Sequence, residues 1–327
     1  MSRTEVPDDL VVLADVGAAL GEGPTWDPRT GTLRWVDIDR GHVWSLEQRD
    51  AGWSTPRRSL DVGPTLGAAV PAQDGGLLLA RTRYVEHRDR AGRVVGTVEV
   101  VPASVASRLN DGACDPAGRF VVGSLALHGG PGDERLWRLE DDGTLTVLDD
   151  DLTLSNGIGW SPDGGVLYVA DTYRHVVFAR TYDAASGRVG PRHVLVETPG
   201  EYPDGLCVDA AGDLWVAFWS AGQVRRYSPD GELVGVLRTG APLTTSCAFV
   251  GDDLGLLVVT TAAKPVPGVP ASPRGGALLA CRPGGVGRPQ PPWRPVPPAA
   301  YRSDGTSAHD EQHVPDEQHV SDEHEGA

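Results

Sequence analysis

Three short polar signals, far apart in the chain, each place an oxygen ligand before a glycine: Glu22-Gly23, Asn156-Gly157 and Asp204-Gly205. Two carboxylates and a neutral amide, with no histidine or cysteine at equivalent positions, suit a hard divalent ion such as calcium, magnesium or manganese, and the set can also accept zinc. Taken alone, each dipeptide is more often an ordinary turn. Their recurrence at matched positions predicts one shared metal site.

The matched positions belong to an internal repeat. With Gly67 and Gly112 included, the glycines stand at positions 23, 67, 112, 157 and 205, a period near 45 residues. Such a period, with several short strands per unit, is typical of a β-propeller, whose blades cannot bury both faces alone and therefore stack around an axis. Polar residues that start successive inner strands then meet at the mouth of the central channel.

Two repeats read clearly as four-stranded blades. In the first, strands are predicted at 156–161, 166–170, 176–182 and 193–197, separated by turn residues, and the next unit repeats this pattern over 204–237. After residue 246 only three strands are predicted, whereas the segment 11–17 resembles an outer strand and can complete that sheet. We therefore predict an all-β, six-bladed propeller over residues 1–294, with the N-terminal strand closing the last blade.

Composition limits the partners and the location. The net charge of −16 opposes nucleic acid or an anionic membrane as a partner, because binding phosphates requires a concentrated basic surface. We recognise no secretory leader and no apolar run of membrane-spanning length. The four cysteines are widely spaced without a CxxC pair, which favours reduced thiols and a cytoplasmic location. Residues 295–327 are predicted to form a disordered, acidic, histidine-containing tail, because their repeats have little apolar content.

Four motifs carry a resemblance: Leu20 to Trp26, Arg108 to Gly112, Ser155 to Gly164 and Pro203 to Asp209. Together they resemble the regucalcin and gluconolactonase family, and the likeness runs in order from about residue 11 to residue 293. The resemblance implies hydrolysis of sugar lactones by a propeller with one catalytic divalent metal, held by Glu22, Asn156 and Asp204. It also implies that Arg108 and Asn110 bind the substrate. Where regucalcin carries a substrate-contacting glutamate, register places His128 in a glycine-rich loop.

Lactone hydrolysis requires a polarised carbonyl and a water that loses a proton, and a divalent cation serves both needs. Asp204 is the candidate general base, because a carboxylate on the metal can reach both the metal and the water. Asp111 is expected to brace its own turn, and the Asp171-Thr172 pair is expected to be blade scaffolding. No Gly-x-Ser-x-Gly elbow supports a serine esterase.

Two alternatives stay open. A related metal hydrolase acting on phosphoesters or organophosphates would use the same cation and the same oxygen ligands. A non-catalytic propeller would bind calcium or a protein partner through its rim. Rim binding does not require Glu22, Asn156 and Asp204 together, so their joint presence favours an enzyme.

Overall fold

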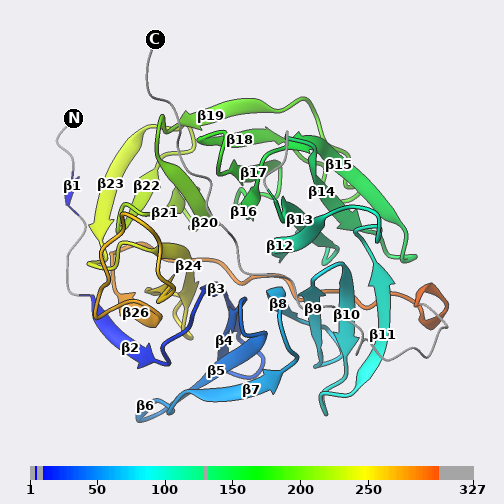
Figure 1. The fold of residues 1–327 in the computed structure, drawn as a ribbon, viewed down its shortest axis with the longest axis horizontal. Helices are drawn as coiled ribbons and strands as arrows, with labels where there is room; N and C mark the ends of the chain where they lie inside the picture. Colours follow the sequence, from blue (N-terminus) through cyan, green and yellow to red (C-terminus); the bar gives the residue numbers. More distant parts are fainter. Residues whose placement is uncertain (1–3, 6–9, 129–131, 302–327) are drawn as a thin grey trace.

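The computed structural model describes residues 4–5, 10–128 and 132–301. Its strands form six sheets arranged around a central axis (Figure 1). Each sheet is one blade, and the strands next to the axis are β3, β8, β12, β16, β20 and β24. The predicted all-β, six-bladed propeller is therefore confirmed.

The first three blades use strands that follow one another directly in sequence. Blade 1 contains β3 (Gly21–Asp27), β4 (Thr32–Asp37), β5 (His42–Arg49), β6 (Gly52–Trp53) and β7 (Arg57–Asp61). Blade 2 contains β8 (Leu66–Pro71), β9 (Leu77–Arg81), β10 (Tyr84–Arg88) and β11 (Val94–Glu99). Blade 3 contains β12 (Ser107–Cys114), β13 (Phe120–Ala126), β14 (Glu134–Leu139) and β15 (Leu145–Leu152).

Blade 4 again uses consecutive strands, whereas blades 5 and 6 each include one strand from the start of the chain. Blade 4 contains β16 (Ser155–Trp160), β17 (Val166–Asp171), β18 (Val176–Thr181) and β19 (His193–Glu197). Blade 5 contains β20 (Tyr202–Val208), β21 (Leu214–Trp219), β22 (Gln223–Tyr227), β23 (Leu233–Arg238) and, parallel to β23, β1 (Thr4–Glu5). Blade 6 contains β24 (Thr244–Val250), β25 (Leu256–Thr261), β26 (Ala277–Cys281) and β2 (Val11–Asp15).

The N-terminal strand closes the ring as the sequence predicts. β2 pairs antiparallel with β26, so that Val11 lies opposite Ala280 and Asp15 lies opposite Ala277. This pairing gives blade 6 the outer strand that its own segment of chain lacks, and it leaves β26 without an open edge. The short β1 was not predicted from the sequence.

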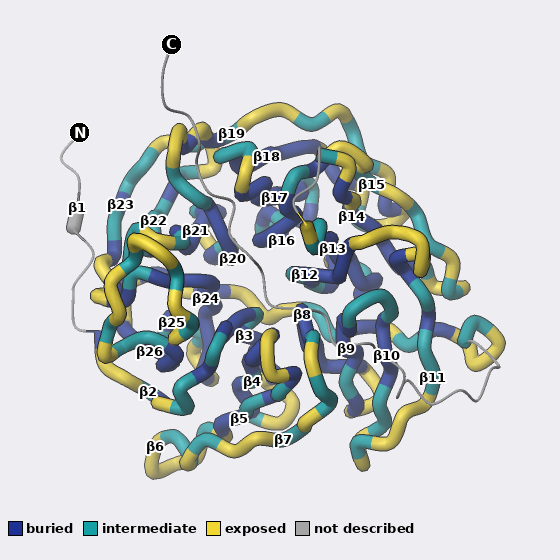
Figure 2. Tube along the Cα trace, viewed as in Figure 1, coloured by how far each residue is buried: buried dark blue, intermediate teal, exposed yellow. Residues whose placement is uncertain are grey.

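The inner and middle strands are buried on both faces, because each blade is covered by its two neighbours. Figure 2 shows the buried residues around the axis and the exposed residues in the outer strands and loops. All six residues of β8 are buried, and β21 reads as the apolar run Leu-Trp-Val-Ala-Phe-Trp. A continuous apolar run is the pattern expected for a strand that is covered on both faces. Between blades 5 and 6, Trp215 and Phe249 pack edge to face with ring centroids 5.5 Å apart.

Each inner strand has an irregular register at the repeated signal, for example between Glu22 and Thr25 in β3 and between Pro203 and Leu206 in β20. Such a bulge bends the strand and changes the direction of its side chains. The glycine of the signal allows the neighbouring inner strand to approach closely. A Cβ atom added at Gly157 would lie 2.6 Å from the carbonyl oxygen of Asp204.

Residues 282–301, which we call the C-terminal strap, cross the propeller from blade 6 to blades 2 and 3 (Figure 1). Trp293 is 1% exposed and pairs with Ala72 in a parallel bridge. At the end of the strap, after the short 3₁₀ helix η1 (Pro298–Ala300), the hydroxyl of Tyr301 lies 2.7 Å from Nδ1 of His87. The packed chain therefore extends beyond the boundary predicted at residue 294. The rest of the predicted tail, residues 302–327, lies outside the described residues.

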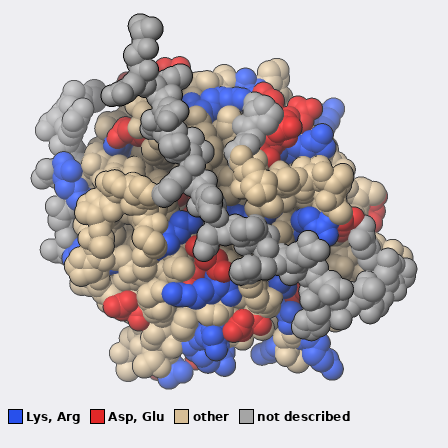
Figure 3. All heavy atoms as spheres, viewed as in Figure 1, with Lys and Arg blue, Asp and Glu red and all other residues tan. Residues whose placement is uncertain are grey.

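Two features of the described residues bear on the predicted partners. No helix among them combines the length and the apolar character needed to cross a bilayer. Acidic and basic side chains are interspersed on the part of the described surface that Figure 3 shows. The cytoplasmic location stays a prediction.

Candidate metal centre and active site

The three predicted metal ligands lie near the starts of inner strands and are buried. Glu22 is carried by β3, Asn156 by β16 and Asp204 by β20. Each side chain is less than a tenth exposed. Because these strands line the same axis and carry the ligand next to the same bulge, the repeat places all three at one level of the channel.

The charges of the buried carboxylates influence one another. Burial raises the pKa of Glu22 well above its ordinary value, and the nearby charges of Asp204 and Asp111 raise it further. Burial also raises the pKa of Asp204, with a further contribution from Asp111. Like charges disfavour one another's ionised form when they lie close together in a medium of low dielectric constant. The metal-free site therefore holds more negative charge than its surroundings stabilise.

Asp111 belongs to this cluster, which the sequence analysis missed. Its pKa is raised to about 6 by burial, and its Oδ1 accepts a hydrogen bond of 2.7 Å from the backbone N–H of Gly112. Glu22 makes the same bond to Gly23, at 3.2 Å. The turn-bracing bond was predicted correctly, but the role is wider, because Asp111 also faces the other carboxylates. The signal was available, since Asp111 directly precedes a repeat glycine as the three predicted ligands do.

The amide of Asn156 is held by a residue of the same blade. Its Nδ2 donates to the hydroxyl of Thr172 at 3.2 Å, and that hydroxyl donates to the carbonyl oxygen of Pro203 at 2.8 Å. Asn156 also makes a hydrogen bond to Asp204, which lowers the pKa of that carboxyl. Thr172 thus fixes the orientation of a proposed ligand, which is a more specific role than general scaffolding.

Asp171 has the scaffolding role that the sequence predicts. Its Oδ1 accepts backbone N–H groups from Thr153 at 3.1 Å and Leu154 at 3.2 Å, in the segment that leads into β16. In blade 1, Asp37 accepts the N–H groups of Ala19 and Leu20 in the same way. A repeated aspartate at the end of the second strand therefore holds the start of each of these two inner strands.

The donor set fits a hard cation. Oδ1 of Asp204 is buried and has no hydrogen-bond partner among the described residues. A buried carboxylate oxygen without a partner is costly, and a divalent cation satisfies both the oxygen and the excess negative charge. Within the described part of the chain, no three histidine, cysteine, aspartate or glutamate side chains are grouped to hold a metal ion by themselves.

Arg108 borders the carboxylates, and its charge lowers the pKa of Glu22. Its Nη1 donates to Oδ1 of Asn110 at 2.9 Å, and Nδ2 of Asn110 donates to the carbonyl oxygen of Ser155 at 3.1 Å. Asn110 thus positions the guanidinium and joins blade 3 to blade 4. His128, in contrast, is exposed in the turn after β13, and its contact with substrate stays a prediction.

A second cation borders the centre from blade 6. Lys264 is the single lysine among the 29 lysine and arginine residues of the chain. Its backbone N–H donates to the carbonyl oxygen of Ala19 at 3.0 Å, just before β3, and its Nζ lies 3.7 Å from Oδ2 of Asp39. Its charge lowers the pKa of Asp204. The sequence analysis missed this residue, and its only signal was the rarity of lysine.

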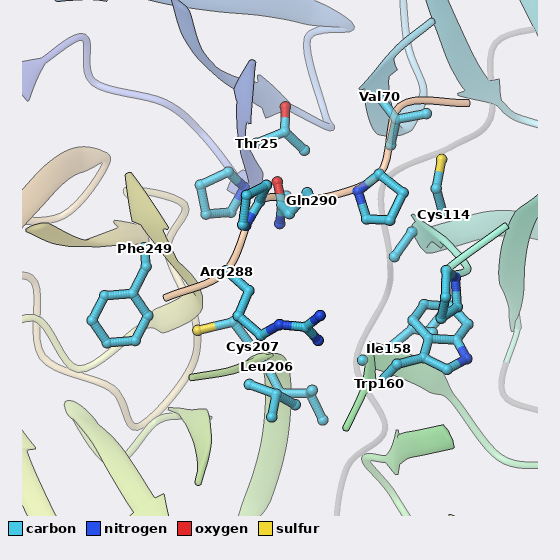
Figure 4. Close-up of a pocket in the computed structure, with 18 of the residues that line it drawn as sticks. Thr25, Val70, Cys114, Ile158, Trp160, Leu206, Cys207, Phe249, Arg288 and Gln290 are labelled. Carbon is cyan, nitrogen blue, oxygen red and sulfur yellow. The ribbon is translucent and has the colours of Figure 1, made fainter. Parts of the chain in front are cut away.

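A cavity of about 270 Å³ extends along the axis from Asp111 to residues 288–291 of the C-terminal strap. Figure 4 shows its walls, with Leu206 and Ile158 from the inner strands and Arg288 reaching toward the middle. The strap thus forms the end of the cavity that lies farthest from the carboxylates.

The fold and these residues define a six-bladed propeller with a buried acidic centre on its axis, bordered by two cationic side chains. The family model described as "SMP-30/Gluconolactonase/LRE-like region" matches residues 20–263. The chain belongs to this family, as the motifs predict.

Individual relatives agree with this assignment. The chain is 36% identical to a pentonolactonase of Haloferax volcanii over 256 residues, which cover 76% of this chain and 84% of that protein. It is 33% identical to a 6-deoxy-6-sulfogluconolactonase of Pseudomonas putida over 248 residues, which cover 75% of this chain and 84% of that protein. The solved structure of regucalcin from Agrobacterium tumefaciens, described as a calcium-binding protein, has a TM-score of 0.77 and 27% identity, and covers 87% of this chain and 97% of its own.

Proposed function

We propose that this protein is a metal-dependent hydrolase of sugar lactones. The observation that carries the proposal is the buried, unpartnered Oδ1 of Asp204 within a group of mutually repelling carboxylates. Family membership and two relatives that are named lactonases support the choice of substrate.

In this proposal, Glu22, Asn156 and Asp204 hold one divalent ion, which can be calcium, magnesium, manganese or zinc. Such an ion, when bound, polarises a lactone carbonyl and lowers the pKa of a nearby water. Thr172 keeps the amide of Asn156 in place for this role, because its hydroxyl accepts a hydrogen bond from the amide N–H. The two carboxylates need the ion in order to remain charged together.

Asp204 is the proposed general base. Its carboxylate accepts the proton of the attacking water, and the same carboxyl group returns a proton to the ring oxygen when the C–O bond of the lactone breaks. Arg108 is proposed to fix several lactone oxygens at once, since a planar guanidinium presents its donors in a fixed arrangement. Asn110 supports this step by holding the guanidinium through the 2.9 Å bond.

The function is tested with a panel of aldonolactones, phosphoesters and an organophosphate, each assayed before and after chelation. We expect lactone opening to disappear on chelation and to return with a divalent ion. Full lactone activity in rigorously metal-free protein would contradict the metal dependence. Turnover of phosphoesters without turnover of lactones would support the alternative hydrolase. Calcium binding without any turnover would support the non-catalytic alternative.

Metal-free protein is expected to become less stable as the pH rises from about 4 to above 6. The pKa of Asp111 rises from 3.8 to about 6 in the folded state, and those of Glu22 and Asp204 also rise. A carboxyl group whose pKa is higher in the folded protein than in the unfolded chain stabilises the fold at pH values below its unfolded pKa. This stabilisation is lost as the pH rises through the folded pKa. Each proton involved changes the free energy of unfolding by about 1.4 kcal/mol per pH unit.

This effect is measured as the difference in melting temperature with and without a divalent ion. We expect the difference to grow with pH across this window, because protons compete with the ion for the same carboxylates. Asp111→Asn should flatten the pH dependence. A difference that stays constant with pH would show that these carboxylates do not share the ion's site.

A further inference from the structure

Two thiols from neighbouring blades meet at the wall of the channel cavity. Cys207 on β20 and Cys247 on β24 have their Sγ atoms 3.7 Å apart, and both residues line the cavity. Cys247 is 2% exposed, whereas Cys207 is partly exposed. The pair lies between blades 5 and 6, where no backbone ladder joins the two sheets.

The two inner strands approach each other closely next to the cysteines. A Cβ atom added at Gly205 would lie 2.1 Å from the hydroxyl oxygen of Ser246, so the strands are in close contact just before the cysteines. The Sγ of Cys247 also donates to the carbonyl oxygen of Trp215 at 3.3 Å, which holds it toward blade 5. A disulfide bond requires a separation of about 2.05 Å between the sulfurs, so its formation must bring the two side chains closer together.

We propose that Cys207 and Cys247 are a site of reversible oxidative modification, at which a small hydroperoxide converts the two thiols into a disulfide bond between blades 5 and 6. The sulfur of one thiolate attacks a peroxide oxygen, the O–O bond breaks, and a sulfenic acid forms. The second thiol then displaces the hydroxyl group as water. The two cysteines together lose two electrons and two protons, and hydrogen peroxide is reduced to two waters.

The surroundings determine how fast this reaction runs. The neighbouring Cys247 and burial raise the pKa of Cys207 well above its ordinary value, so little thiolate is present near neutral pH. Because the thiolate is the reactive form, oxidation is slow and accelerates as the pH rises. The cavity of about 270 Å³ admits hydrogen peroxide but not the active site of a protein oxidoreductase. The pair therefore acts as a slowly formed cross-link rather than a rapid redox sensor.

The cross-link would add a second covalent connection between blades 5 and 6, which are otherwise joined by the chain between β23 and β24. The two cysteines are separated by 40 residues, which include the outer strands of blade 5. Blade 6 is completed only by β2 from the other end of the chain. A disulfide across this loop restricts the unfolded chain and should raise the melting temperature by about 5 °C.

The test uses the full-length protein, treated with hydrogen peroxide at pH 8, alkylated and digested with trypsin without reduction. Because Arg225, Arg226 and Arg238 separate the two cysteines, their peptides stay together only if the disulfide has formed. We expect this linked pair, its loss on reduction, and a melting temperature about 5 °C higher before reduction. The matched control is Cys114→Ser, since Figure 4 shows Cys114 across the cavity from Cys207.

Cys207→Ser and Cys247→Ser should each abolish the linked peptide, whereas Cys114→Ser should retain it. The wild-type peptide map decides the question even if a variant folds poorly. Four alkylated thiols after treatment, a link to Cys114, or sulfinic acid at Cys207 without a link would each overturn the proposal. A linked protein that melts no higher than the reduced protein would overturn the stabilising role.

Discussion

Asp204→Asn is expected to lower kcat/KM for a sugar lactone by about a thousandfold or more, because it removes a metal ligand and the proposed general base together. The substitution keeps the shape of the side chain, so the melting temperature of the metal-free protein should not fall. It should even rise slightly, since a neutral amide relieves the repulsion from Asp111 and Glu22. Metal affinity is measured by calorimetry, and turnover is measured on the lactone panel.

The matched control is Asp171→Asn. Asp171 is a buried aspartate at the end of β17, the second strand of blade 4. Asp171 holds the backbone N–H groups of Thr153 and Leu154, so its loss should cost about 1–3 kcal/mol of stability. Its turnover at a temperature well below melting should remain within a few fold of wild type. If both variants lose turnover equally while folded, Asp204 has no special chemical role.

Trp293→Ala is expected to have the largest effect on stability of any single substitution in the C-terminal strap. The indole is 1% exposed, packs edge to face on His87 at 4.9 Å, and its backbone is bridged to Ala72. Truncating a buried tryptophan costs about 3–5 kcal/mol, which corresponds to a fall of about 5–8 °C in the melting temperature of a unit of this size. The strap also closes the channel cavity, so its loosening should expose that end of the cavity to solvent.

Two controls separate this anchor from the rest of the C-terminal region. Arg294→Ala removes an exposed ion pair to Asp141 from the same strap and should cost less than about 1 kcal/mol. Deleting residues 302–327 should leave the melting temperature nearly unchanged, because their composition has little apolar surface to bury. A Trp293→Ala protein with the same melting temperature as the wild type would show that the strap is not part of the folded core.

The repeat makes the centre asymmetric. At the positions that precede the repeat glycines, four of the inner strands carry Glu22, Asp111, Asn156 and Asp204, whereas β8 carries Leu66. The polar positions therefore cover only part of the ring. Arg108 and Lys264 border the cluster from blades 3 and 6. In the proposed metal site, a one-sided set of ligands would leave part of the ion's coordination sphere for substrate and water.

The sequence alone determined the architecture, and it grouped the three residues that are proposed as metal ligands. A period near 45 residues, turn residues between short apolar runs and a last unit lacking one strand were enough to predict six blades and their closure by the segment that forms β2. These features are local or periodic, and a repeat places equivalent residues at equivalent points in space. Glu22, Asn156 and Asp204 could therefore be grouped without coordinates.

Only the tertiary structure decided the contacts that no period encodes. Asp111 was visible in the repeat, but its shared electrostatics with Glu22 and Asp204 depend on burial and on distances across the axis. Lys264 comes from a loop outside the repeat pattern, and the strap packs through Trp293 and, at its end, Tyr301. The contact between Cys207 and Cys247 likewise depends on how closely two blades approach at Gly205. Packing across the sheets sets these distances, and a sequence pattern specifies only which residues are available to meet.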